Sequence, residues 1–199
     1  KIITTAEGGV AITNSKSIAH TLSLFRSHGV TKDSALMLNE PDGPWYYEQQ
    51  ILGFNYRMTD IQAALGISQL ERIDEFIASR LKIADRYDDA FEDLPLVLPH
   101  KSNDATSALH LYIIRLKLDE INLTHLDFFK ALLAKGIGIN LHYIPIYRQP
   151  YFKRFNIDYK NFINAEKYYQ EAVSIPIFSS LSIKEQDEVI HCISSTLNS

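Results

Sequence analysis

The residue with the clearest potential for covalent chemistry is Lys1, which precedes a Thr-, Glu- and Gly-rich segment ending at Gly9. The neutral amine of a lysine attacks aldehydes, and the imine that forms can be exchanged for a substrate amine. A lysine at a chain end is nearly always a solvated surface residue, so Lys1 taken alone is a weak signal. Glu7, in the same segment, is expected to fix the glycine turn rather than to react.

A second group of polar residues suits an anion. Asn55 and Arg57 come just before Thr59, which has the spacing of a capping box with Gln62. Amide and guanidinium donors beside a helix N-terminus are well suited to a phosphate. The plainer alternative is a turn stabilised by Asn55 and an ion pair between Arg57 and Asp60.

The composition is that of a soluble globular protein. Of the 199 residues, 46% are hydrophobic and 22% are charged, and the net charge is −4. No block of Lys or Arg stands out, so binding to nucleic acid or to an anionic membrane is not indicated. No apolar run reaches the length of a membrane span and no signal-peptide pattern opens the chain, which favours a cytoplasmic location.

Several other chemistry-bearing patterns are absent from the sequence. There is no Cys/His cluster with metal-ligand spacing, no Walker loop and no Gly-x-Ser-x-Gly nucleophile elbow. The one cysteine, Cys192, lies in a helical apolar pattern, where a small buried residue is the expected role. No metal site is therefore predicted.

Hydrophobic spacing and capping signals indicate the elements that must position these residues. Thr59 and Gln62 mark the start of the strongest helix, whose apolar residues step by three or four positions up to Pro95. The expected elements, in order, are a strand over 10–13, a helix over 15–28, an irregular stretch over 31–53, a long and bent helix over 58–94, a strand over 109–116, a helix over 124–135, a strand over 138–141, a helix over 164–173 and a last helix capped by Ser182.

Four segments together resemble one enzyme family. They are Lys1-x-x-Thr-Thr-Ala-Glu-Gly-Gly9, Phe25-Arg-Ser-His-Gly29, Gly53-Phe-Asn-Tyr-Arg-Met-Thr-Asp-Ile-Gln-Ala-Ala-Leu65 and Gly138-Ile-Asn-Leu-His-Tyr-Ile-Pro145. In this order, and over nearly the whole chain, they resemble the DegT-type sugar aminotransferases, which use pyridoxal 5'-phosphate (PLP). The Pro41 to Tyr47 loop and the segment from His142 to Tyr151 are most similar to members that make a UDP-linked 4-amino-4,6-dideoxy sugar for pseudaminic acid.

The resemblance implies an α/β fold, namely the C-terminal part of a fold-type-I PLP aminotransferase. Residues 1–57 would finish the large PLP-binding domain, residues 58–94 would be a long connecting helix, and residues 95–199 would form a small α/β domain. The acidic partner of the pyridine nitrogen, the cover of the ring and a phosphate loop would all lie upstream of Lys1. We therefore expect the chain to be a piece of a longer protein that binds PLP poorly by itself.

The resemblance also implies roles for individual residues. Lys1 would carry the cofactor and act as the general acid and base. Asn55 and Arg57 would reach the PLP phosphate of the neighbouring subunit, so that each active site needs a homodimer. The implied reaction moves an amino group from an amino acid, commonly glutamate, to C4 of a UDP-linked 4-keto-6-deoxy sugar.

Further candidates for substrate binding are aromatic and basic. By alternation, one of His142 and Tyr143 points inward and the other outward. The histidine could donate to sugar or diphosphate oxygens, and the tyrosine could stack on a sugar. Tyr147 and Arg148 could face the nucleotide, with Arg148 as a phosphate partner, and Trp45 could line the substrate mouth. A satisfied core histidine beside a packed tyrosine, and an aromatic loop against a dimer partner, remain open alternatives.

Two other functions stay open at this point. The first is an aminotransferase of the same family that acts on another nucleotide sugar, of the perosamine or aminoarabinose type. The second belongs to another class, a non-catalytic dimerisation or regulatory domain.

Overall fold

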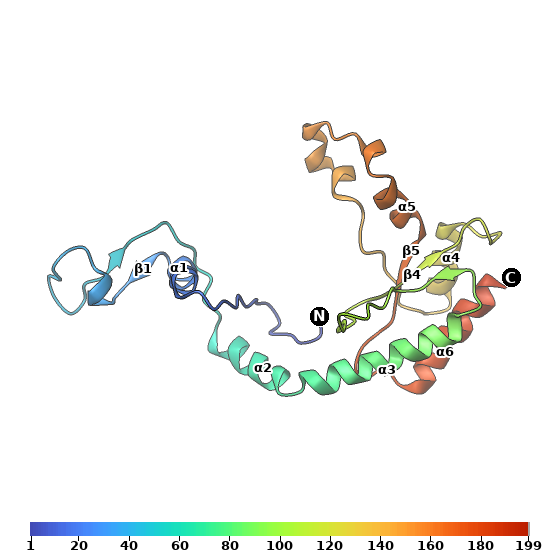
Figure 1. Ribbon diagram of the computed structural model, residues 1–199, viewed down its shortest axis with the longest axis horizontal. Coiled ribbons are helices and arrows are strands. Elements are labelled where there is room, and N and C mark those ends of the chain that lie inside the picture. Colours follow the sequence, from blue (N-terminus) through green and yellow to red (C-terminus); the bar gives the residue numbers. More distant parts are fainter. Residues whose placement is uncertain (199) are drawn as a thin grey trace. The chain divides into compact units, whose positions relative to one another are not determined.

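The computed structural model describes residues 1–198 and divides into two compact units (Figure 1). One unit is Ile3–Glu71, and the other combines Lys1–Ile2 with the chain from Arg72 onward. No helix within residues 1–198 is both long enough and apolar enough to cross a bilayer.

The unit Ile3–Glu71 contains two α-helices, one 3-10 helix and one short pair of strands. Its elements are α1 (Lys16–Arg26), β1 (Val30–Thr31), the 3-10 helix η1 (Ser34–Leu36), β2 (Glu48–Gln49) and α2 (Asp60–Leu70). Ser15 caps α1, and Thr59 and Gln62 form the expected capping box at α2. β1 and β2 pair antiparallel. The helix predicted over 15–28 is confirmed, and the stretch over 31–53 is irregular except for η1 and the short strands.

A backbone crossing at two glycines joins the end of α1 to the segment before α2. The Phe54 N–H donates to the Phe25 carbonyl at 2.7 Å, and the His28 N–H donates to the Phe54 carbonyl at 2.8 Å. At Gly29, which has a φ of +70°, a Cβ would lie 1.8 Å from a facing carbonyl oxygen. A Cβ at Gly53 would lie 2.2 Å from the Gly29 nitrogen. Only glycine permits such an approach at both positions.

The strand predicted over 10–13 is wrong. This segment has no regular structure, and its Val10 and Ile12 side chains are 81% and 92% exposed. A strand needs partners for its backbone N–H and C=O groups, and no strand of the described residues pairs with this segment. The apolar pattern identified side chains suited to burial but could not supply a neighbouring strand.

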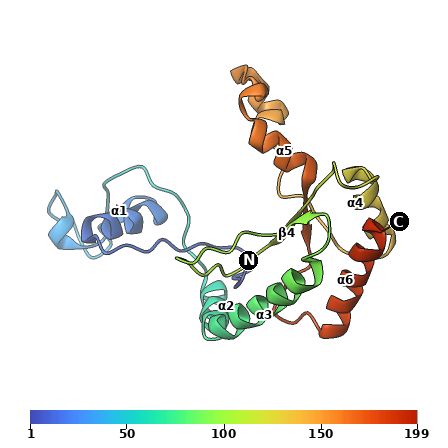
Figure 2. The same ribbon diagram turned by 45° about the vertical axis from the view of Figure 1, so that its right-hand side comes forward.

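The second unit is built from helices packed on a three-stranded antiparallel sheet (Figure 2). Its main elements are α3 (Ile73–Phe91), β3 (Leu96–Val97), β4 (Tyr112–Leu116), α4 (His125–Ala134), α5 (Ile163–Glu171), β5 (Ala172–Ile175) and α6 (Ile183–Leu197). The strand order is β3-β4-β5, and alternate residues of β4 are buried. They pack with apolar side chains of α3, α4 and α6 in a core that includes Tyr87, Phe91, Tyr112, Ile114, Phe128, Leu132 and Ile193.

The long helix expected over 58–94 is two helices, because the chain turns between the end of α2 and the start of α3. No residue of α2 is buried, whereas the apolar stripe of α3 enters the core. A sequence boundary between the two compact units falls in this turn, between Glu71 and Arg72. The functional division into 1–57, 58–94 and 95–199 stays a prediction.

Helix ends in the second unit agree with the sequence signals. Thr124 caps α4, which stops before Gly136 at a φ of +79°. Ser182 and Glu185 form a capping box at α6. Cys192 is buried in α6, as its apolar surroundings in the sequence predicted.

The strands of this unit were harder to predict. The predicted helix over 164–173 is α5 followed directly by β5, because residues 172–175 pair with β4. β4 begins at Tyr112 rather than at Leu109, whose φ of +49° is incompatible with a strand. The strand predicted over 138–141 is reduced to one bridge between Asn140 and Ser174.

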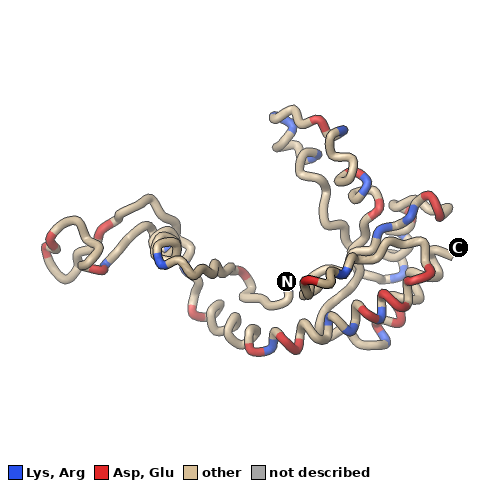
Figure 3. Tube along the Cα trace, viewed as in Figure 1, with Lys and Arg blue, Asp and Glu red and all other residues tan. Residues whose placement is uncertain are grey.

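Residues 145–162 leave the sheet and form a small lobe, called here the aromatic lobe. It contains three 3-10 helices, η2 (Ile146–Arg148), η3 (Pro150–Phe155) and η4 (Tyr159–Asn161), and it lies beyond α5 (Figure 1). Figure 3 shows several Lys and Arg residues at this lobe, whereas acidic and basic residues are interleaved along α3. The lobe therefore concentrates aromatic rings and cations away from the core.

Candidate functional site

Lys1 has an exposed side chain and belongs to the same compact unit as the sheet. The charge of Lys1 acts on His110, a residue not singled out from the sequence. Partial desolvation lowers the pKa of His110, and the positive charges of the amino terminus, Arg80, Lys1 and His142 act in the same direction. Basic groups from three separate parts of the chain therefore gather around His110.

Arg80 binds the backbone of the segment that contains His110. Its Nη1 donates to the carbonyls of Leu109 and His110 at 3.0 and 3.3 Å, and to that of Ile177 at 2.9 Å. The Arg80 residue is only 6% exposed, and desolvation lowers its pKa. A sequence signal for this role existed, because Arg80 stands four residues after Phe76 on the stripe of α3 that enters the core. A cation at such a position requires buried acceptors.

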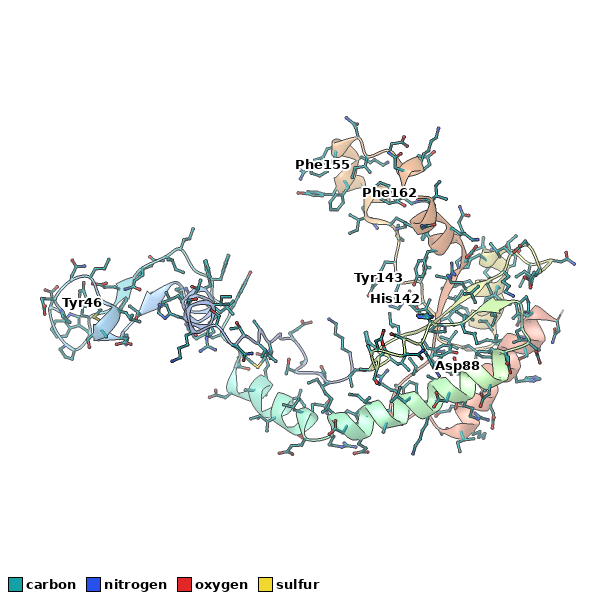
Figure 4. The ribbon with its side chains drawn as sticks, in the orientation of Figure 1. Tyr46, Asp88, His142, Tyr143, Phe155 and Phe162 are labelled. Carbon is teal, nitrogen blue, oxygen red and sulfur yellow. The ribbon has the colours of Figure 1, made fainter. Side chains whose placement is uncertain are left out.

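His142 and Tyr143 alternate as predicted: His142 is half-buried and Tyr143 is 73% exposed (Figure 4). The bridge between Asn140 and the buried Ser174 places the histidine beside β5. Its Nδ1 lies 2.7 Å from the Ser174 Oγ, and its ring meets that of Tyr143 edge-on at 4.6 Å. Since Nδ1 is engaged with Ser174, Nε2 is the ring nitrogen left to meet a ligand.

Tyr147 and Arg148 lie at the base of the aromatic lobe. The Arg148 Nε donates to Glu166 at 3.0 Å, its Nη2 also pairs with Glu166, and its guanidinium lies 4.7 Å above the Tyr169 ring. The Arg148 partner holds the pKa of Glu166 below its usual value. Tyr147 stacks on Phe162 at 4.9 Å. Both residues also line a hollow in the lobe.

Arg57 lines a basic hollow in the unit Ile3–Glu71. The hollow has a volume of about 610 Å³, and its lining residues are Ser27, His28, Val30, Lys32, Tyr47, Gln49 and Arg57. Three of these can carry positive charge and none is acidic. Asn55 is bridged to Ser27, so it lies beside this hollow. The alternative ion pair between Arg57 and Asp60 does not form within the described residues.

Trp45 belongs to a loop that is organised around one buried carboxylate. Glu48 accepts hydrogen bonds from the Leu38 N–H at 2.7 Å, the Asn39 N–H at 2.8 Å and the Tyr46 hydroxyl at 3.1 Å. The backbone N–H of Leu38 is the largest cause that lowers the pKa of Glu48, to about 2. Trp45 itself is 71% exposed. The loop is thus fixed at Glu48 and presents Trp45 to its surroundings; Figure 4 labels the adjacent Tyr46.

The candidate residues fall into two sets. Lys1, His142, Tyr143, Tyr147 and Arg148 belong to one compact unit, and Trp45, Asn55 and Arg57 belong to the other. The first set contains an exposed primary amine, Lys1, and the second contains the guanidinium of Arg57 in a basic hollow. Within residues 1–198 no three His, Cys, Asp or Glu side chains form a group that could hold a metal ion.

Comparison with known proteins extends over the whole chain. Residues 1–194 match the DegT/DnrJ/EryC1/StrS aminotransferase family. The spore coat polysaccharide biosynthesis protein SpsC of Bacillus subtilis is 34% identical over 97% of this chain and 50% of its own length. The UDP-4-amino-4,6-dideoxy-N-acetyl-beta-L-altrosamine transaminase of Campylobacter jejuni is 34% identical over 93% of this chain and 46% of its own length.

Solved structures give the same result. PseC of Helicobacter pylori, an aminotransferase of pseudoaminic acid biosynthesis, covers all of this chain with a TM-score of 0.88 at 30% identity. The putative sugar aminotransferase Spr1654 of Streptococcus pneumoniae, in its PMP form, does so with a TM-score of 0.84 at 28% identity. Each match uses 51% of the solved chain, so this chain spans about half the length of these proteins.

These matches confirm the predicted fold class, part of a fold-type-I sugar aminotransferase. They also cover every segment on which the resemblance was based, from Lys1 to Pro145. With a family match over nearly its entire length, the chain belongs to the DegT/DnrJ/EryC1/StrS aminotransferases.

Proposed function

We propose that the protein containing this chain transfers an amino group from an amino acid, with glutamate as the expected donor, to C4 of a UDP-linked 4-keto-6-deoxy sugar. The observation that carries the proposal is Lys1: its primary amine stands three residues before the Thr-Thr-Ala-Glu-Gly-Gly segment in a chain that belongs to a sugar aminotransferase family. Relatives named for a UDP-sugar transaminase and for pseudoaminic acid biosynthesis support the substrate class.

The proposed cofactor is PLP, which when bound would supply the aldehyde and the electron sink for amino-group exchange. Lys1 would hold the cofactor covalently between turnovers and, once released, move a proton to and from the reacting carbon. Asn55 and Arg57 would bind the phosphate with amide and guanidinium donors. In the proposal this phosphate belongs to the neighbouring subunit, so the active sites of a homodimer are shared.

Substrate binding is proposed for His142, Tyr143, Tyr147, Arg148 and Trp45. The His142 Nε2 would contact a sugar or diphosphate oxygen while Ser174 holds Nδ1. Tyr143, which is largely exposed, would stack on the sugar, and Trp45, also largely exposed, would line the substrate mouth. Tyr147 and Arg148 would face the nucleotide. The partners proposed are thus the UDP-sugar, the amino-acid donor and a second copy of the chain, in the cytoplasm, with no nucleic acid and no membrane.

A second candidate is transfer to another nucleotide sugar by the same chemistry. SpsC, a protein of spore coat polysaccharide biosynthesis, is as similar to this chain as the altrosamine transaminase, at 34% identity each. A sugar of the perosamine or aminoarabinose type would fit this candidate.

The test is an amino-transfer assay on the intact protein with glutamate and a panel of UDP-, GDP- and dTDP-linked keto sugars. We expect turnover with the UDP-linked 4-keto-6-deoxy sugar and a loss of roughly 10³-fold or more in Lys1→Arg. Lys16→Arg, an exposed lysine at the start of α1, is the matched control and should keep full activity. Full activity of Lys1→Arg would refute the proposal, and turnover with only a GDP- or dTDP-linked sugar would select the second candidate.

A further inference from the structure

The hollow in the aromatic lobe has the size and lining of a small-molecule site. Its volume is about 560 Å³, and its lining residues are Tyr147, Arg148, Lys153, Asn156, Ile157 and Tyr159. Pockets for small ligands usually measure about 300–1,000 Å³ and combine aromatic walls with a few polar groups. Here two rings and two cations meet, and no lining residue is acidic.

The two cations differ in what they can offer a ligand. Arg148 is held in place by Glu166, which takes its Nε and Nη2 donors and offsets its charge, so mainly Nη1 is left. Lys153 is exposed, and within residues 1–198 no acidic side chain lies in ion-pair distance of its ammonium. The net positive charge of the hollow therefore resides on Lys153.

The remaining lining residues are two tyrosines, one isoleucine and one asparagine. Tyr147 is fixed by its stacking on Phe162, with 21° between the ring planes. Tyr159 is 55% exposed and Ile157 is 39% exposed, so both present surface that a flat ring could cover. Asn156 adopts the left-handed conformation at the end of η3, and its side-chain amide adds a donor and an acceptor.

We propose that the hollow of the aromatic lobe binds the nucleoside diphosphate part of the substrate, with Lys153 as its principal phosphate ligand. The diphosphate would lie between Lys153 and the Arg148 Nη1 edge, and the base would pack on Tyr159 near the Asn156 amide. The inference rests on the proposed function for its choice of ligand. It also changes the expected role of Arg148, which mainly pairs with Glu166.

Charge in the rest of the lobe is consistent with an anionic ligand. Asp158, the only acidic residue between positions 145 and 162, uses its carboxylate to cap the Lys160 N–H at 3.0 Å. Arg154 lies over the Tyr151 ring at 3.9 Å and does not line the hollow. The lobe thus carries four cations and one carboxylate, in a chain whose net charge is −4.

The test is calorimetric titration of the intact protein with UDP. Lys153→Ala should weaken UDP binding about tenfold, the effect of losing one charge-assisted contact at an open site. Lys160→Ala is the matched control, because Lys160 lies in the same lobe but does not line the hollow. An equal effect of the two variants, or an unchanged affinity in Lys153→Ala, would overturn the inference.

Two further arms identify the part of the nucleotide that is bound. Inorganic diphosphate should bind more weakly than UDP and lose affinity in Lys153→Ala, whereas the affinity for uridine should be unchanged by that substitution. Tyr159→Leu should weaken UDP and uridine by a similar factor and leave diphosphate unchanged. If uridine binding depends on Lys153, or diphosphate binding on Tyr159, the assignment of Lys153 to the diphosphate and of Tyr159 to the base is wrong.

The outcome is independent of the transfer assay. Turnover of a UDP-sugar with no effect of Lys153→Ala on UDP affinity would support the proposed function and refute the proposed UDP site. UDP binding that depends on Lys153, without any amino transfer, would support the proposed UDP site and refute the proposed reaction.

Discussion

Glu48 has the most strongly shifted pKa in the unit Ile3–Glu71, because Leu38, Asn39 and Tyr46 all donate hydrogen bonds to its carboxylate. Its folded pKa of about 2 lies below the ordinary 4.5, so ionised Glu48 stabilises the fold. This contribution is fully present above the unfolded pKa and is lost as the pH falls from about 4.5 toward 2.

Replacing Glu48 by Gln should therefore lower the melting temperature clearly at pH 7 and much less near pH 2.5. Thermal unfolding followed by circular dichroism at several pH values measures this difference. Glu40→Gln changes an exposed carboxylate of the same loop and should have little effect at any pH. A Glu48→Gln penalty that stays constant between pH 7 and pH 2.5 would contradict the assignment.

Arg80→Leu should destabilise the protein by roughly 2–4 kcal/mol, because the carbonyls of Leu109, His110 and Ile177 would lose a buried donor. Urea denaturation of the intact protein gives this value. Lys82→Leu, an exposed position on the same helix, should change the stability by less than about 0.5 kcal/mol. A similar loss of stability in both variants would mean that the hydrogen bonds of Arg80 do not stabilise the protein specifically.

Residue-level prediction worked where the chemistry is local. Lys1, Asn55 and Arg57 were found from motifs, and their proposed roles still await test. His110 and Ser174 were not found, because the charge of Lys1 that acts on His110 and the hydrogen bond between His142 and Ser174 join residues far apart in the sequence. Such contacts leave no spacing pattern in the sequence.

Among the elements, helix starts were predicted best, since a capping box involves only four consecutive residues. The box at Ser182 begins α6, which packs against α3 and α4. Ser182→Ala should cost about 1 kcal/mol of stability, measured by urea denaturation. Ser180→Ala removes a hydroxyl just outside the helix and should be nearly neutral; a cost as large as that of Ser182→Ala would show that capping is not responsible.

Strands were predicted poorly for a physical reason. Residues 10–13 have the apolar composition of a strand but no partner among the described residues, whereas residues 172–175 continue a helical pattern and yet pair with β4. Strand formation depends on distant segments, while helix formation depends on neighbours in sequence. The turn between α2 and α3 was missed for a similar reason, because apolar spacing continues through it.

At the scale of the whole molecule, the unit Ile3–Glu71 leaves an unusual number of apolar side chains exposed. Leu24 is its only apolar residue that is buried, while Ile12, Leu38 and Leu52 are each more than 85% exposed. Soluble proteins rarely leave such surfaces free. The chain spans about half the length of the relatives it matches, so the rest of such a protein, or a second copy, would be expected to cover them.

The isolated chain should accordingly bind the dye ANS strongly and sediment as a concentration-dependent mixture. Leu52→Gln combined with Ile12→Gln should reduce the dye fluorescence, and the same pair in the intact protein should destabilise it, because the side chains would then be buried. Leu118→Gln at a position packed on the core of the other unit is a control that should not reduce dye binding. A monodisperse, dye-silent chain would contradict the expectation.

The crossing at Gly29 and Gly53 has a mechanical consequence. With backbone pressed on backbone and no side chain between, the two segments have no room to slide or tilt independently. A displacement of α1 is therefore expected to move the backbone just before Arg57, where the Tyr56 N–H also donates to the Arg26 carbonyl at 2.9 Å. If Arg57 binds the cofactor phosphate as proposed, the position of α1 would therefore help to set the position of this arginine.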